Sequence, residues 1–231
     1  MKLLTIGDGS AKIAKSDKSS DIYRSAIMYL APHKLSGYNV CPHASAGCIA
    51  ACLNTAGMGK FNSVQVARIN RTKFFYEKRD EFKKQLFSEI LSFVEKCKKD
   101  GKVAVIRLNG TSDIRWEVIF PEIFEYFGDV VFYDYTKNYK RMMQFAAGLL
   151  PSNYHLTFSR SESNNDLCLD VLKAGGNVAA VFKSLPTKYF GFTVENADED
   201  DLRFLDSRGT IQGLTPKGKA KKDTSGFVIV G

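Results

Sequence analysis

The sequence predicts an α/β protein whose largely parallel sheet forms a (β/α) barrel or a partial, TIM-like barrel. Helical and extended patterns alternate after residue 60, which is typical of right-handed βαβ units. The chain has 231 residues, 44% of them hydrophobic, and α/β barrels often form one unit at this length. Several such units with irregular ends favour a barrel over a Rossmann sheet. We therefore expect residues 1–231 to form a single domain.

The helical segments carry apolar residues at helical spacing. In the longest, residues 72–99, Phe, Leu and Ile side chains recur every three or four positions, and Asp100-Gly101 follows as a stop signal. The next, residues 114–126, contains Pro121, which predicts a kink or break. Two further helices are expected over residues 137–149 and 164–173.

Short runs rich in β-branched and aromatic residues predict the strands. Turn residues bound most of these runs, as Asn109-Gly110 does after the apolar run VAVIRL. The strands are expected over residues 26–30, 103–108, 130–135, 154–159 and 178–182, with shorter ones near 190–194, 211–214 and 227–230.

The composition favours a cytoplasmic protein with an anionic partner. No apolar run approaches the roughly 20 residues of a membrane span, and the polar N-terminal stretch does not resemble a signal peptide. The formal net charge is +8, which suits nucleic acid, a small anionic ligand or simply a solvated basic surface. The basic segment 215–226 either closes over such a ligand or is a solvated loop. The sequence predicts no oligomeric state.

Three cysteines lie within twelve residues, at Cys41, Cys48 and Cys52. On a helix beginning near Gly47, the second and third would share one face, and Cys41 would fold over them from the preceding loop. Clustered thiolates suit a soft metal centre, and a helix N-terminus helps to hold an anionic cluster. We therefore predict a [4Fe–4S] cluster with three protein ligands and one open iron.

Other interpretations of these cysteines stay open. Zinc is the main competitor, with His43 as the nearest fourth ligand. A cluster of three small buried residues is the structural alternative. Cys97 and Cys168 fall on the apolar faces of their helices and are expected in the core.

Polar side chains follow the ends of the central strands, where ligands of parallel barrels bind. Because Gly110 permits close backbone approach, we expect a cleft at this end of the sheet. Helix capping is the simpler role for several of these residues. The candidate ligand-binding residues are Asn109, Ser112, Asp113, Tyr135, Lys137, Arg160, Glu162 and Lys183.

The ordered motifs CPHASAGCIAAC, VQVARINRTKFF, RLNGTSDIRWE, FYDYTKN, YHLTFSRSE and GGNVAAVF resemble an uncharacterised bacteriophage protein family over nearly the whole chain. Members of that family look like relatives of radical S-adenosylmethionine (SAM) proteins. The resemblance implies a phage origin, hence the host cytoplasm, a partial barrel and a [4Fe–4S] cluster after the first strand. The cysteine spacing here, CxxxxxxCxxxC, is longer than the CxxxCxxC of radical SAM proteins.

Two functions follow from the cluster and the resemblance. One is a radical-SAM-like enzyme that cleaves S-adenosylmethionine, whose amino and carboxylate groups would bind the open iron beside residues 109–113. The other is a non-catalytic redox or nucleic-acid-associated iron–sulfur protein. The sequence assigns no catalytic residue.

Overall fold

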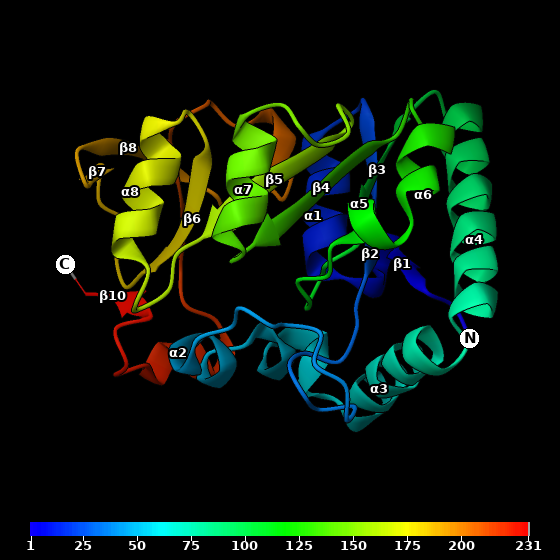
Figure 1. Ribbon diagram of the computed structural model, residues 1–231, viewed down its shortest axis with the longest axis horizontal. Helices are drawn as coiled ribbons and strands as arrows, with labels where there is room; N and C mark the ends of the chain where they lie inside the picture. Colours follow the sequence, from blue (N-terminus) through cyan, green and yellow to red (C-terminus); the bar gives the residue numbers. More distant parts are fainter. Residues whose placement is uncertain (231) are drawn as a thin grey trace.

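The computed structural model describes residues 1–230, and its strands form one ten-stranded, mostly parallel sheet (Figure 1). The strand order is β1-β2-β3-β4-β5-β6-β9-β8-β7, with β10 beside β6. The strands are β1 (Leu4–Ile6), β2 (Tyr23–Met28), β3 (Val103–Arg107), β4 (Val131–Thr136), β5 (Tyr154–Ser159), β6 (Asn177–Phe182), β7 (Lys188–Tyr189), β8 (Phe192–Asn196), β9 (Ile211–Leu214) and β10 (Val228–Ile229).

The predicted α/β class and mostly parallel sheet are confirmed, but the sheet does not close into a barrel. Strands β2 to β6 lie in chain order and pair in parallel, as consecutive βαβ units require. At one end, β1 pairs antiparallel with β2, and at the other β7 pairs antiparallel with β8. Because these two short strands occupy the outer positions, the described strands form an open sheet.

Helices cover both faces of the sheet and one of its ends (Figure 1). Helices α4, α6, α7 and α8 lie on one face, α1 lies on the other, and α2 and α3 lie below the end at which the parallel strands finish. The helices are α1 (Ala11–Ser19), α2 (Ala46–Ala50), α3 (Asn62–Glu77), α4 (Arg79–Lys99), α5 (Trp116–Ile119), α6 (Pro121–Tyr126), α7 (Tyr139–Ala146) and α8 (Asn165–Lys173).

The structure shows two helix breaks, one that was not expected from the sequence and one that was. The single helix expected over residues 72–99 is two helices, because Lys78 leaves helical backbone at φ −139° and ψ 56°. The break expected at Pro121 is confirmed, since α5 ends at Ile119 and α6 begins with that proline. Proline fits the first helical position, where no backbone donor is needed.

The main core lies between the sheet and the helices of the α4 face. Trp116 is fully buried and contacts the rings of Phe75, Phe82 and Phe120. Cys97 and Cys168 are buried in the same core, as expected. Burial of large aromatic side chains supplies much of the hydrophobic stabilisation of such a core.

A buried ionic network connects the loop after β3 with two helices and the start of β5. Arg141, on α7, is fully buried, and its Nε and Nη2 atoms donate to the two carboxylate oxygens of Glu117 at 3.0 and 2.8 Å. Its Nη1 atom lies 3.3 Å from Asp113 Oδ1. Nη2 also donates to the hydroxyl of Tyr154 on β5. One guanidinium therefore joins α5, α7, β5 and the loop after β3.

The network continues through a buried carboxyl group on β4. The Tyr154 hydroxyl donates to Asp134 Oδ2 at 2.6 Å, and the backbone N–H of Asn109 donates to Asp134 Oδ1 at 2.7 Å. Burial raises the pKa of Asp134 to about 6, against the opposing effects of the Tyr154 hydrogen bond and the Arg141 charge. One carboxyl group on β4 thus binds both the loop after β3 and the start of β5.

No helix in the described part of the chain is long and apolar enough to cross a membrane.

We expect Arg141→Met to lower the free energy of unfolding by about 3–5 kcal/mol, because it leaves buried carboxylates without their cation. The matched control is Lys83→Met, which breaks a half-exposed pair with Glu122 and should cost less than about 1 kcal/mol. Urea denaturation of the two variants measures both. Equal stability loss in the two would contradict the role given to Arg141.

Candidate functional site

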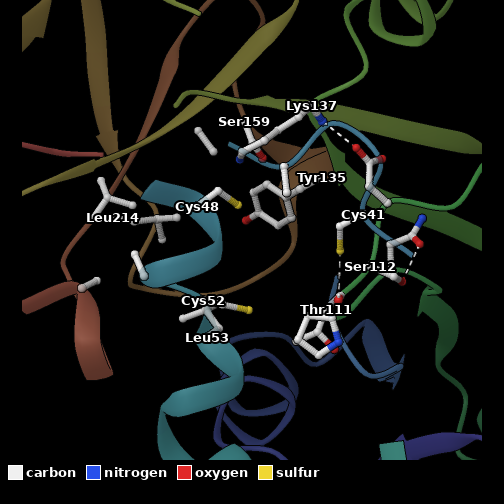
Figure 2. A pocket seen from close by; sticks show the side chains of 18 of the residues that line it. Cys41, Cys48, Cys52, Leu53, Thr111, Ser112, Tyr135, Lys137, Ser159 and Leu214 are labelled. Carbon is white, nitrogen blue, oxygen red and sulfur yellow. Dashed lines mark hydrogen bonds between the residues drawn. The ribbon is translucent and has the colours of Figure 1, made fainter. Parts of the chain in front are cut away.

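A cavity of about 220 Å³ lies at the carboxyl ends of the parallel strands, between the sheet and α2. We call it the thiol cavity, because Cys41, Cys48 and Cys52 all line it (Figure 2). Its position is the one at which α/β proteins commonly bind ligands. Much of its wall is apolar and includes Pro32, Ala44, Leu53, Val181, Leu214 and Phe227.

The loop after β3 forms part of the wall but uses its polar atoms internally. The Asn109 side chain donates to Asp134 and Ile114, and its Oδ1 atom accepts from Ser112 Oγ at 2.7 Å and Trp116 Nε1 at 3.1 Å. Asn109 and Ser112 therefore stabilise the loop rather than presenting donors and acceptors to a ligand. A Cβ atom at Gly110 would lie 2.6 Å from a backbone carbonyl oxygen of β2, so the glycine lets the loop pack closely against this strand.

The loop after β4 provides the next part of the wall. Asp113 accepts from Thr136 Oγ1 at 2.8 Å and from the backbone N–H of Lys137 at 2.9 Å. The Tyr135 ring lies 4.5 Å from the guanidinium of Arg107, a cation–π distance. The side chains of Tyr135 and Lys137 both line the thiol cavity (Figure 2).

Of the predicted residues Arg160 and Lys183, only the first lines the cavity. Arg160 lines the cavity, but its Nη1 atom donates to the carbonyl oxygens of Gly226 and Phe227 at 2.6 and 3.0 Å. It therefore holds the C-terminal segment in place. Lys183 is exposed, does not line the cavity, and joins β10 through its backbone N–H.

Glu162 occupies the N-terminus of α2. Its carboxylate accepts from the backbone N–H of Gly47 at 2.8 Å and from Ser45 Oγ at 2.7 Å. Burial favours a higher pKa for Glu162, but the hydrogen bonds to its carboxylate and the nearby charge of Lys137 together outweigh it, and the pKa lies below its ordinary value. The positive end of α2 is thus neutralised by a carboxylate of the chain itself.

The thiols face the cavity in an environment that keeps two of them protonated. Cys41 Sγ accepts from the His33 backbone N–H at 3.4 Å and donates to the Thr111 carbonyl at 3.7 Å (Figure 2). Burial raises the pKa of Cys41 to about 12. Burial also raises the pKa of Cys52, whereas a hydrogen bond from the Asn54 backbone lowers it in part. A thiol that stays protonated is a poor nucleophile and a poor ligand.

The prediction of an iron–sulfur protein, radical-SAM-like or non-catalytic, is wrong, and so is the lesser prediction of a zinc protein. Among the residues that the structure describes, no group of three or more His, Cys, Asp and Glu side chains could hold a metal ion. The fourth ligand considered for zinc, His43, is exposed. The cysteines share a cavity without forming a metal centre.

Two local features explain why the cysteine spacing misled. Helix α2 ends at Ala50, and Cys52 has φ −54° and ψ 135°, so Cys48 and Cys52 do not share a helical face. The positive helix end expected to hold an anionic cluster already binds the Glu162 carboxylate. Sequence spacing reveals neither a helix of five residues nor a partner 115 positions away.

The basic segment 215–226 and the residues on either side of it form one side of the cavity. From the sequence, this segment either closed over a ligand or was a solvated loop. Leu214, Thr215, Lys217, Ala220 and Phe227 all line the cavity. Sequence reasoning missed Phe227 as a wall residue, because β10 reaches the site only by pairing with β6. It also missed Arg107, although an arginine inside an otherwise apolar strand was a usable signal.

The family model described as Gene product 88 matches residues 3–231. The chain belongs to the Gene product 88 family. This membership confirms the bacteriophage part of the resemblance and supplies no link to radical SAM proteins. No curated protein and no solved structure matches the chain.

We expect alkylation of Cys41 by iodoacetamide to rise about tenfold per pH unit from pH 7 to 10 without levelling off. The reason is that thiolate is the reactive form, and its fraction keeps growing below a pKa of about 12. Peptide mass spectrometry after timed labelling measures the rate. In the urea-unfolded control the rate should level off above about pH 9. A plateau below pH 9 in the folded protein would show that burial does not hold this thiol protonated.

Proposed function

We propose that this phage protein binds a small organic anion in the thiol cavity, with Lys137 as the cationic contact. One observation carries the proposal: Lys137 lines the cavity and forms no ion pair with a carboxylate among the described residues. The other lysine of the cavity, Lys217, is paired with Asp198 at 2.6 Å. Lys137 is therefore the cavity's available positive charge.

The walls define the rest of the ligand. Lys137 Nζ lies 5.7 Å from the centre of the Phe227 ring, and the Tyr135 ring forms another wall. Apolar and aromatic walls with few convergent polar groups are typical of small-molecule sites. A flat apolar body with one acidic group fits this distribution. S-adenosylmethionine stays a prediction from the resemblance and forms no part of this proposal, which also assigns no catalytic step.

We expect Lys137→Met to weaken binding of 1-naphthoate about tenfold or more, because it removes one charge-assisted hydrogen bond. Binding of the neutral analogue 1-naphthamide should not change. Lys183→Met is the matched control, since that exposed lysine lies outside the cavity. Isothermal titration calorimetry measures all affinities. An equal effect of the two substitutions on 1-naphthoate would refute the role of Lys137.

Nucleic acid is a second candidate partner, favoured by exposed lysines beside the cavity. Lys219, Lys221 and Lys222 are exposed on the 3-10 helix η5 (Gly218–Lys222), whose Ala220 lines the cavity. Lys217 belongs to a different class, because its charge is neutralised by Asp198.

If single-stranded DNA binds at η5, replacing Lys219, Lys221 and Lys222 together by Gln should flatten the dependence of log K on log salt by about two. The cause is the loss of counterion release at phosphates that those lysines contact. Fluorescence anisotropy over a salt series measures the slope, and Lys183→Gln is the single-charge control. No binding by the wild-type chain at low salt would eliminate this candidate.

A further inference from the structure

A second cavity of about 500 Å³ adjoins the thiol cavity. We call it the arginine cavity. The two cavities share wall residues, namely Leu53, Arg107, Gly110, Thr111 and Lys217. Its remaining walls come from the start of the chain, the 3-10 helix η3 (Gly57–Lys60), α3 and the segment before the 3-10 helix η4 (Arg203–Leu205).

Arg68 is the central feature of the arginine cavity. It lies on α3, only 6% of its surface is exposed, and its Nε atom has no hydrogen-bond partner in the described part of the chain. A buried donor without a partner loses its hydration and gains nothing in return, at a cost of several kcal/mol for a charged group. Such a group is expected where a ligand supplies the missing acceptor.

The position of the Arg68 guanidinium is fixed by neighbours that leave its charge uncompensated. Its Nη1 atom donates to Asn54 Oδ1 at 2.5 Å, and its central carbon lies 4.8 Å from the centre of the Tyr29 ring. Both neighbours are uncharged. Burial lowers the pKa of Arg68, which is the direction expected for a cation without a carboxylate beside it.

The backbone of η3 passes directly against this guanidinium. A Cβ atom at Gly59 would lie 3.1 Å from Arg68 Nη1 and 2.7 Å from the Asn54 carbonyl oxygen. Any larger residue at Gly59 would therefore push into the group that carries the charge. The glycine keeps the wall close to Arg68 without filling the cavity.

The charges around the cavity do not balance. Arg71 also lines it and, like Arg68, forms no ion pair with a carboxylate among the described side chains. The two acidic residues of the wall are already engaged, since Asp198 pairs with Lys217 and Asp200 pairs with Arg203. The Nε and Nη1 atoms of Arg71 donate to the carbonyl oxygens of Lys2 and Tyr29 at 2.7 and 3.4 Å, and the Glu89 carboxylate partly offsets the effect of burial on its pKa. Arg68 and Arg71 thus bring two positive charges to the wall of one cavity, and neither forms an ion pair among the described side chains.

We propose that the arginine cavity binds a phosphoryl group of a small molecule, with Arg68 as the principal contact and Arg71 as the second cation. A phosphoryl group carries close to two negative charges at neutral pH and several acceptor oxygens, which match two guanidinium groups without ion pairs better than a single carboxylate does. This site goes beyond the proposed function and does not depend on Lys137. The cavity is larger than a phosphate ion, so it has room for the rest of the ligand beside the wall that it shares with the thiol cavity.

The test is isothermal titration of the full chain with inorganic phosphate and with pyrophosphate, in a buffer free of other oxyanions. Arg68→Met should weaken both affinities about tenfold or more, because one charge-assisted contact contributes about 1.5–3 kcal/mol. Arg68→Lys keeps the charge but loses the planar fork, so its affinity should lie between those of wild type and Arg68→Met. If circular dichroism shows that Arg68→Met is unfolded, the Arg68→Lys variant decides.

Arg79→Met is the matched control, because it removes an exposed arginine at the start of α4, outside both cavities. The inference is overturned if Arg79→Met and the folded Arg68 variants have the same effect, or if wild type binds neither anion at about 10 mM. It is also overturned if Lys137→Met abolishes phosphate binding while the Arg68 variants retain it, a result that would leave the proposed function standing. A different result would support the inference and refute the proposed function: Lys137→Met and Lys183→Met affect 1-naphthoate binding equally, while phosphate binding still depends on Arg68.

Discussion

The side chain of Arg141 is fully buried and bonds to Glu117, Asp113 and Tyr154, so one guanidinium joins four separate parts of the chain. Asp113 lies in the loop after β3, Glu117 on α5, and Tyr154 at the start of β5. The loop after β3 forms part of the wall of the thiol cavity, and the hydrogen bonds of Asp113 and Asn109 hold this loop in the network. A buried cation is stable only when its acceptors are in place. The position of Arg141 therefore constrains the loop that carries Asp113.

The cations around the two cavities fall into two classes. Arg107 is neutralised by Asp201 at 3.0 Å and Lys217 by Asp198, so both serve the structure. Lys137 and Arg68 form no ion pair with a carboxylate among the described side chains. The difference gives a physical basis for separating structural charges from candidate binding charges, most strongly for the buried Arg68, since an uncompensated buried charge is costly unless a ligand completes it. Net charge alone cannot make this distinction.

The thiols show how a cavity can gather reactive residues without forming a metal centre. Cys41, Cys48 and Cys52 reach the same space, but burial keeps the pKa of Cys41 at about 12, and the described side chains do not form a group that could hold a metal. The Glu162 carboxylate already binds the N-terminus of α2, where an anionic cluster was expected. The cysteines therefore serve as small, polarizable wall residues beside a site whose binding charge lies elsewhere.

The sequence by itself determined the α/β class, the strands β3 to β6 and β9 to within one or two residues, and the burial of Cys97 and Cys168, because these depend on local periodicity and turn residues. It also placed Asn109, Asp113 and Lys137 at one end of the sheet, since parallel strands finish together.

Only the tertiary structure decided that the sheet stays open and that the helix carrying Cys48 stops before Cys52. Only the tertiary structure also showed that Asn109 and Arg160 use their polar atoms on backbone and side-chain partners, while Lys137 and Arg68 form no ion pair with a carboxylate among the described side chains. The reason is that edge pairing, helix length and charge compensation depend on residues distant in the sequence, which local patterns do not record.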